Sequence, residues 1–80
     1  MSEELVYSRL RSFICGRVPH KLADHDSLIE SGAFDSIGIL ELVAFIEKEF
    51  RVRLEDEDVS PENFASIQSV AGFVLDKVRA

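Results

Sequence analysis

Apolar residues recur every three or four positions in three stretches of the chain, which is the pattern of a helix with one buried face. The first stretch contains Val6, Leu10, Phe13 and Ile14. The second contains Ile39, Leu42, Val43, Ile46 and Phe50. The third contains Ile67, Val70, Ala71, Val74 and Val78. The spacing therefore predicts three main amphipathic helices, and its signal is strongest in the second.

Turn-forming and capping residues separate these stretches. Gly16 and Pro19 predict the end of the first helix. Residues 60–62, Ser-Pro-Glu, have the order of an N-cap, a first-turn proline and an acid that suits the helix dipole, so they predict a short additional helix. Ser66 stands where it can cap the last helix.

Residues 17–35 form a connection without a clear period, and a loop of this length in so small a domain usually has a function. Leu28, Ile29 and Phe34 are expected to hold it against the core. No stretch alternates apolar and polar residues for long enough to predict a sheet. The expected fold is all-α, a single domain of residues 1–80. It is a small four-helix bundle of three main helices and one short helix, with a long loop between the first two.

The charge balance and the size of the chain narrow the classes of function. The 80 residues carry 15 acidic and 9 basic side chains, a net charge of −6. This argues against nucleic acid as the ligand, since phosphate binding needs clustered cations. A chain of this size buries one thin core and has no room for a deep cleft between two lobes, so a free-standing enzyme is not expected.

Cysteine usage and the N-terminal residues constrain the compartment. Cys15 is the single cysteine, which excludes an internal disulfide and fits a reducing cytosol. Glu3 and Glu4 stand where a signal peptide would carry cations. No apolar run approaches the ~18 residues of a membrane-spanning helix. We therefore expect a soluble, cytoplasmic protein without a membrane span.

The metal-binding patterns in the acidic segments are incomplete. The acids that begin at Asp56 imitate the opening of a calcium loop, but Pro61 and Ile67 stand where such a loop requires Gly and Glu. A second acidic run, from Asp24, has Leu28 at its fifth position. Capping of turns is the expected role of these acids.

Zinc binding and nucleophilic catalysis are also disfavoured. Cys15, His20 and His25 lack the paired spacing of structural zinc sites, so a buried thiol and two surface imidazoles are the favoured interpretation. Residues 34–38 lack the leading glycine of a hydrolase nucleophile elbow, and no predicted strand precedes them. The sequence predicts no metal site and no catalytic residue.

Ser36 follows Asp35 where the long loop meets the most amphipathic helix. Unpaired backbone N–H groups and the positive end of the helix dipole lie at such a position, and both suit a phosphate ester. On position alone, Asp35 or Ser36 would simply cap the helix. Gly38 costs the helix about 1 kcal/mol relative to Ala, which a purely structural helix has little reason to carry.

Ile37 and Leu40 lie off the apolar stripe of this helix and leave extra apolar surface near Ser36. Residues 35–58 hold eight acids against three bases, a net charge of −5. An apolar spot rimmed by one sign of charge is typical of a transient docking surface, although a solvated charged face has the same pattern.

The run of residues 29–43 resembles the attachment motif of the acyl and peptidyl carrier proteins. The resemblance extends over almost the whole chain. The N-terminal helix, the long loop ending in Gly-x-x-Asp-Ser, the Glu-Leu-Val of residues 41–43, Phe50 and residues 61–64 all match the family's layout.

The resemblance implies that Ser36 receives 4′-phosphopantetheine from coenzyme A through a phosphodiester, in a reaction catalysed by a separate phosphopantetheinyl transferase. The chain itself would catalyse nothing. It would hold acyl or aminoacyl groups as thioesters on a flexible arm, which raises their effective concentration for a loading enzyme and for downstream biosynthetic enzymes. By the same analogy Asp35, Ile37, Leu40 and Glu41 would contact these partners, and we expect a monomer.

The chain departs from the fatty-acid carriers at Gly38, where an acid is usual, and at Lys48, which interrupts an acidic stretch. A glycine at this place is familiar in carriers of polyketide, nonribosomal-peptide and D-alanyl pathways. The resemblance therefore favours a carrier in a specialised pathway, and Met1 favours a free-standing chain over an excised domain. The alternative from another class is an unmodified helical adaptor whose apolar patch binds one protein partner.

Overall fold

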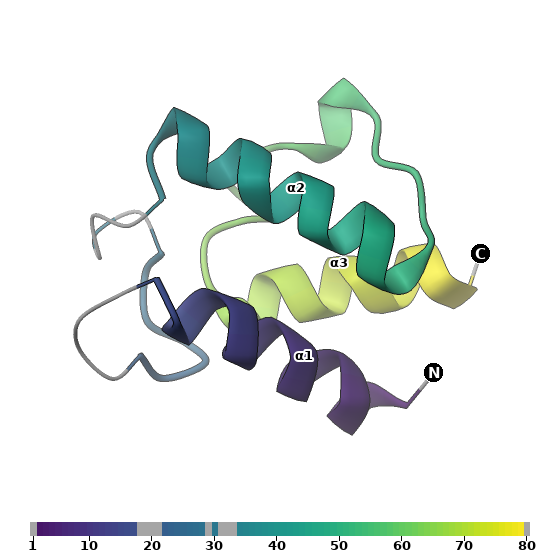
Figure 1. The fold of residues 1–80 in the computed structure, drawn as a ribbon, viewed down its shortest axis with the longest axis horizontal. Coiled ribbons are helices and arrows are strands. Elements are labelled where there is room, and N and C mark those ends of the chain that lie inside the picture. Colours follow the sequence, from purple (N-terminus) through teal and green to yellow (C-terminus); the bar gives the residue numbers. More distant parts are fainter. Residues whose placement is uncertain (1, 18–21, 29, 31–33, 80) are drawn as a thin grey trace.

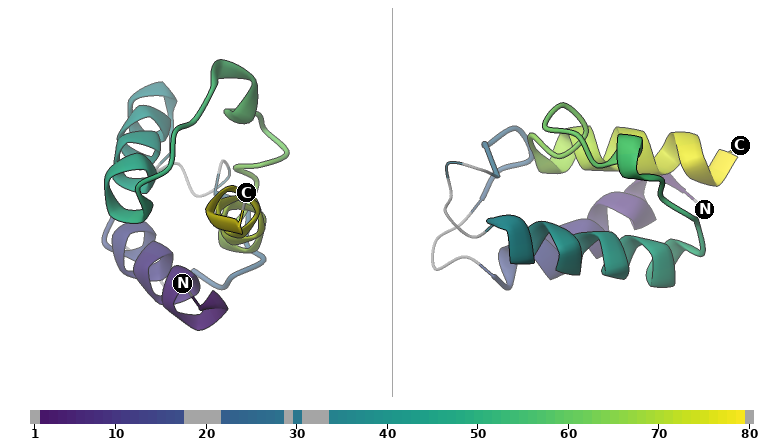
Figure 2. Two further views of the ribbon diagram at one scale, coloured as in Figure 1. Left: turned by 90° about the vertical axis from the view of Figure 1, so that its right-hand side faces the viewer. Right: turned by 90° about the horizontal axis from the view of Figure 1, so that it is seen from above.

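The computed structural model describes residues 2–17, 22–28, 30 and 34–79. They form three α-helices, α1 (Glu3–Cys15), α2 (Ser36–Phe50) and α3 (Ile67–Arg79), and one 3₁₀ helix, η1 (Asp56–Asp58). No strand occurs among these residues. The predicted all-α bundle is confirmed, and Figures 1 and 2 show its three long helices around a common interior. None of the helices in the described ranges is long and apolar enough to cross a membrane.

The short helix differs from the prediction in position and type. Ser60 does begin a turn: its Oγ accepts the Asn63 N–H at 3.2 Å and its carbonyl accepts the Phe64 N–H at 3.1 Å. The turn does not continue into a helix, because one turn is a costly nucleus and Ser66 starts α3 immediately afterwards. The prediction of a helix opening at residues 60–62 was therefore wrong. The short helical element is η1, two residues upstream.

The apolar stripes of the three helices meet in one core. Buried residues from all three helices confirm the predicted stripes, and four members of the stripes lie at the core's partly buried edge: Phe13, Ile39, Val43 and Val78. Leu75, which lies outside the predicted stripe of α3, is also buried. Among the helix pairs, α1 packs most closely against α3.

The long loop is fastened to the start of α3. Leu28 is fully buried and Phe34 is 5% exposed, as predicted. The Leu28 N–H donates to the Ala65 carbonyl and the Gln68 N–H donates to the Asp24 carbonyl, each at 2.9 Å. Ile29 lies outside the described residues. These contacts set the point from which the chain enters α2.

Aromatic side chains fill the space between α1 and α2. Phe13 of α1 stacks on Phe45 of α2 with ring centroids 4.3 Å apart, and Phe50 meets Phe45 edge-on at 6.2 Å. α1 ends at Cys15 with Gly16 as its C-cap, as predicted, while Pro19 lies outside the described residues. The amino end of α2 is thereby held beside the long loop, where the candidate site lies.

Candidate functional site

The amino end of α2 begins at Asp35, which is the N-cap. Its backbone is extended, its Oδ1 accepts the Gly38 N–H at 2.9 Å, and its carbonyl accepts the Ile39 N–H at 2.9 Å. Ser36 is the first residue of the helix. Asp35 therefore provides the cap that sequence reasoning assigned to either residue. Ser36 stands in the first turn, at the positive end of the helix dipole.

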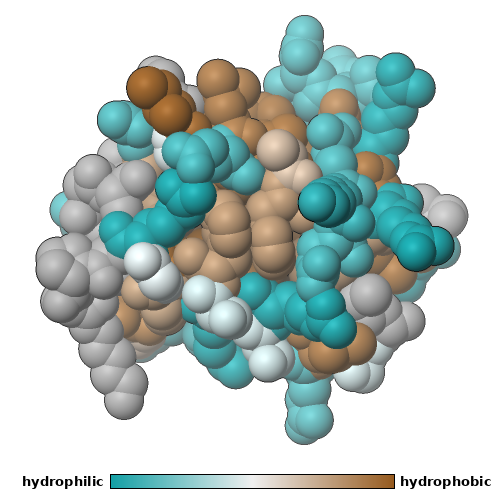
Figure 3. Space-filling view, viewed as in Figure 1, coloured by the Kyte–Doolittle hydropathy of each residue, from teal (hydrophilic) through white to brown (hydrophobic). Residues whose placement is uncertain are grey.

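Two exposed apolar side chains follow this helix start. Ile37 and Leu40 are each 67% exposed, whereas Leu42, on the same helix, is fully buried. The predicted separation of an outer pair from the core stripe is therefore confirmed. Figure 3 shows apolar side chains on the face that α2 presents, interrupted and flanked by hydrophilic ones.

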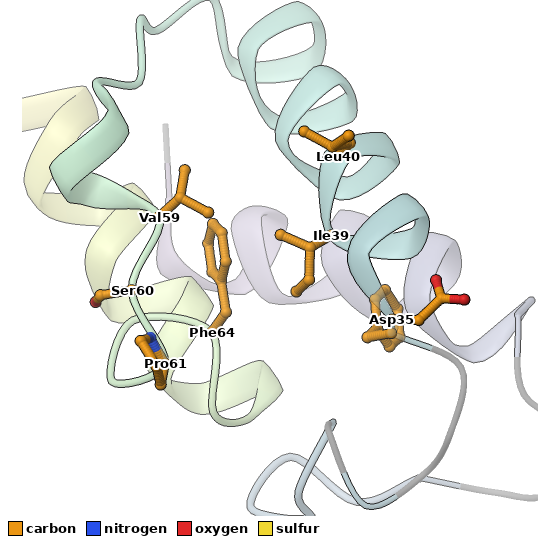
Figure 4. Close-up of a pocket in the computed structure, with 8 residues that line it drawn as sticks. Asp35, Ile39, Leu40, Val59, Ser60, Pro61 and Phe64 are labelled. Atoms are coloured by element: carbon orange, nitrogen blue, oxygen red, sulfur yellow. The ribbon is translucent and has the colours of Figure 1, made fainter.

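An open groove runs beside the amino end of α2. Phe34, Asp35, Ile39 and Leu40 line one side, and Val59, Ser60, Pro61 and Phe64 line the other. Its volume is about 520 Å³. In Figure 4 Ile39 of α2 points toward Val59 and Phe64, while the Asp35 carboxylate points away from the groove. Mainly apolar side chains thus line a groove that begins at Asp35, the residue before Ser36.

The second wall of the groove was not recognised from the sequence. Residues 59–64 carry two apolar side chains, Val59 and Phe64, but no helical period that would assign them a face. Phe64 is 2% exposed and meets Phe73 of α3 edge-on, with centroids 6.1 Å apart. The wall is therefore anchored to α3 by its aromatic residue.

An ion pair fixes the start of this wall. Lys77 of α3 lies 2.8 Å from Asp58 of η1, and the Asn63 side-chain amide donates to the Asp58 carbonyl at 2.8 Å. The hydrogen bond from Lys77, together with the Glu55 N–H, lowers the pKa of the Asp58 carboxyl. η1 and the segment after it are thus tied to the carboxyl end of α3.

Cations from outside residues 35–58 neutralise part of the acidic surface of that segment. Glu41 pairs with Arg17, Glu49 pairs with Arg9, and Asp58 pairs with Lys77. These cations come from outside residues 35–58, so the charge count of that segment overstates its free negative charge. The Arg17 guanidinium also lies 4.6 Å from the centre of the Phe13 ring. The surface of residues 35–58 is therefore less acidic than its sequence suggests.

The acids considered as metal ligands have other partners. Arg11 donates two hydrogen bonds to Asp24, at 2.8 and 2.5 Å, and these lower the pKa of that carboxyl. Asp26 Oδ2 accepts the Ala23 N–H at 2.8 Å. No group of three or more potential ligands gathers within the described ranges, and His20 lies outside them.

Comparisons with known proteins identify the family. Residues 11–74 match the family model of the phosphopantetheine attachment site. The acyl carrier protein of Bdellovibrio bacteriovorus is 36% identical over 62 residues, covering 78% of this chain and 77% of that protein. The acyl carrier protein of Buchnera aphidicola is 34% identical over 55 residues, covering 69% and 68%. That of Thermosynechococcus vestitus is 26% identical over 83 residues and covers both chains completely.

The family match favours the carrier over the unmodified adaptor, since the matched model is defined by cofactor attachment and includes the whole of α2. Members of this family are carriers and not enzymes. The chain belongs to the acyl carrier protein family, whose members bear covalently attached 4′-phosphopantetheine.

Proposed function

We propose that Ser36 is the residue to which 4′-phosphopantetheine is attached, and that residues 1–80 act as a single carrier domain. The observation that carries this proposal is the position of Ser36 in the first turn of α2. Asp35 takes the capping role, so the Ser36 hydroxyl is not required for the cap. The positive end of the helix dipole then favours the phosphate that attachment would place there.

The attachment is a phosphoryl transfer with coenzyme A as the donor. The Ser36 oxygen forms a new bond to the phosphorus of the phosphopantetheine half, and the pyrophosphate bond of coenzyme A breaks. Adenosine 3′,5′-bisphosphate leaves, and the serine proton passes to a base of the transferase. The carrier contributes the nucleophile and the docking surface, and the transferase contributes the catalysis.

The groove supports a role for the same end of α2 in holding the arm or its cargo. It begins at Asp35 and Phe34 and is lined mainly by apolar side chains. An acyl chain would bury apolar surface there, which is favourable by about 25 cal/mol per Å². The thioester at the end of the arm would remain available to partner enzymes at a high effective concentration.

Asp35, Ile37, Leu40 and Glu41 would contact the phosphopantetheinyl transferase, the acyl- or aminoacyl-loading enzyme and the downstream enzymes. The exposure of Ile37 and Leu40 supports this assignment. Gly38 of α2 supports a polyketide, nonribosomal-peptide or related specialised pathway. It stands where the fatty-acid carriers usually have an acid, so α2 lacks that negative charge. We propose a cytoplasmic monomer, in keeping with the single cysteine of the chain.

Intact mass spectrometry tests the attachment site. Incubation with coenzyme A, magnesium and a broad-specificity phosphopantetheinyl transferase is expected to add one phosphopantetheinyl unit to the wild-type chain and none to Ser36→Ala. Ser60→Ala is the matched control, because Ser60 also lines the groove and caps a turn. Equal modification of Ser36→Ala would refute the site. An unmodified wild-type chain would favour the helical adaptor.

A further inference from the structure

Arg17 connects the end of α1 to α2, the helix that carries the proposed partner contacts. It follows the C-cap of α1, and its guanidinium forms an ion pair with Glu41 of α2. The same guanidinium lies 4.6 Å from the centre of the Phe13 ring, and Phe13 stacks on Phe45 of α2. The side chains of Arg17 and Glu41 are 33% and 46% exposed. The pair is thus preorganised by an aromatic surface and still accessible to a partner.

Asp35 and Glu41 are the acids at this end of α2, and of the two Glu41 is the one that forms an ion pair with Arg17. It directly follows Leu40, which is 67% exposed. The Asp35 carboxylate accepts the Gly38 N–H in the helix cap, and Gly38 has no side chain to add a charge. Arg17 therefore neutralises the carboxylate that stands next to the main apolar contact of the docking surface.

We propose that Arg17 is a specificity-determining residue that competes with partner enzymes for Glu41. A partner that docks on α2 must displace the Arg17 guanidinium with a cation of its own. The partner that fits is a protein with an apolar pocket for Leu40 and an adjacent arginine, because the planar fork of arginine can donate two hydrogen bonds to the Glu41 carboxylate, whereas Arg17 donates one. A partner that is attracted only by long-range electrostatics would bind α2 more weakly, because Arg17 already neutralises Glu41. This inference rests on the proposed carrier function.

The chain contains a matched pair for comparison. Arg9 of α1 forms an ion pair with Glu49 of α2, so it joins the same two helices. Glu49 lies eight residues beyond Glu41, which is about 12 Å along the helix axis. Arg9→Gln and Arg17→Gln therefore make the same change in net charge, and each breaks one ion pair to a glutamate of α2. They differ in their distance from Ser36.

The experiment measures the rate of phosphopantetheine transfer, as kcat/KM, for the wild type and for both variants against sodium chloride concentration. The probe is a broad-specificity transferase with a basic docking surface. Arg17→Gln is expected to raise kcat/KM by about two- to five-fold at low salt, the range that corresponds to an exposed ion pair. It should also steepen the fall of the rate with salt. Arg9→Gln should change the low-salt kcat/KM and its salt dependence much less.

A second comparison tests whether the effect of Arg17→Gln depends on the Glu41 carboxylate. In a Glu41→Gln background, Arg17→Gln should no longer raise the rate, because there is no carboxylate left to release. Equal rates for Arg17→Gln and Arg9→Gln, or a gain that persists without Glu41, would overturn the inference. Failure of the wild-type chain to accept any phosphopantetheine would instead overturn the proposed function. The two failures are therefore distinguishable.

Discussion

Leu40 and Leu42 allow the same substitution to be made on two faces of one helix. Leu40 is 67% exposed and Leu42 is fully buried. Full burial of a leucine side chain is worth about 1.5–3 kcal/mol, so the buried third of Leu40 contributes about 0.5–1 kcal/mol. The greater helix propensity of alanine offsets a few tenths of this. Leu42→Ala removes the whole burial and leaves a cavity, which costs about 2–5 kcal/mol.

These costs predict separate effects in thermal unfolding. Each 1 kcal/mol shifts Tm by roughly 4–8 °C in a domain of this size. Leu42→Ala should therefore lower Tm by at least about 8 °C, and Leu40→Ala by less than about 8 °C. For phosphopantetheine transfer the order should be reversed, with the larger effect from Leu40→Ala. Leu40→Ala should lower kcat/KM by about five- to thirty-fold through 1–2 kcal/mol of lost docking, while folded Leu42→Ala should react normally.

Circular dichroism melts and transfer kinetics, measured on the same samples, provide the test. Ile46→Ala serves as a second core control because Ile46 is also fully buried in α2. If Leu40→Ala unfolds as readily as Ile46→Ala while its folded fraction is modified at the normal rate, Leu40 belongs to the core. The assignment of the docking surface would then have to be withdrawn.

Three further predictions concern the cap, the groove wall and the docking charge. Asp35→Ala should destabilise the fold by about 0.5–2 kcal/mol, because the Gly38 N–H loses its acceptor, and urea titration should detect the loss. The pKa of Asp58 is lowered from its ordinary value of 3.8 by Lys77, so the pair stabilises the fold above pH 3.8 and loses that contribution as the pH falls through the lower folded-state pKa. Lys77→Met should therefore melt below the wild type at neutral pH, with the difference shrinking in acid. Glu41→Lys should slow association with the transferase in stopped-flow measurements yet change stability by less than about 0.5 kcal/mol; a rate insensitive to this change and to salt would mean that the acids are only a solvated face.

The helical periods predicted the fold because each helix buries one side of itself. Leu10, Leu42 and Val74 were assigned to the core from spacing alone, and all three are fully buried. Asp35 and Ser66 were assigned to helix starts by their capping chemistry, which acts over three residues and is therefore visible in sequence. Local rules succeeded at these two helix starts, whereas the same capping pattern at residues 60–62 produced a turn and no helix.

The charge pairing could not be predicted in this way. Arg17 and Glu41 are 24 residues apart, and Arg9 and Glu49 are 40 residues apart. Their meeting depends on how α1 and α2 lie against each other, which the periods of the separate helices do not specify. The groove has the same origin, since its second wall follows from the path of residues 59–64 and not from any repeat within them. The exposed apolar pair of α2 was located from sequence, but the free negative charge around it was overestimated.

The division of α2 into faces explains how one helix can serve both stability and recognition. Leu42 and Ile46 face the core, Ile39 faces the groove, and Ile37 and Leu40 remain exposed. Because the core positions and the exposed positions do not overlap, the outer pair can be substituted at little cost to stability. The ion pairs from Arg9 and Arg17 neutralise two carboxylates of α2 without occupying a core position. Under the proposed role of Arg17, partner specificity can be altered from a residue that lies outside α2.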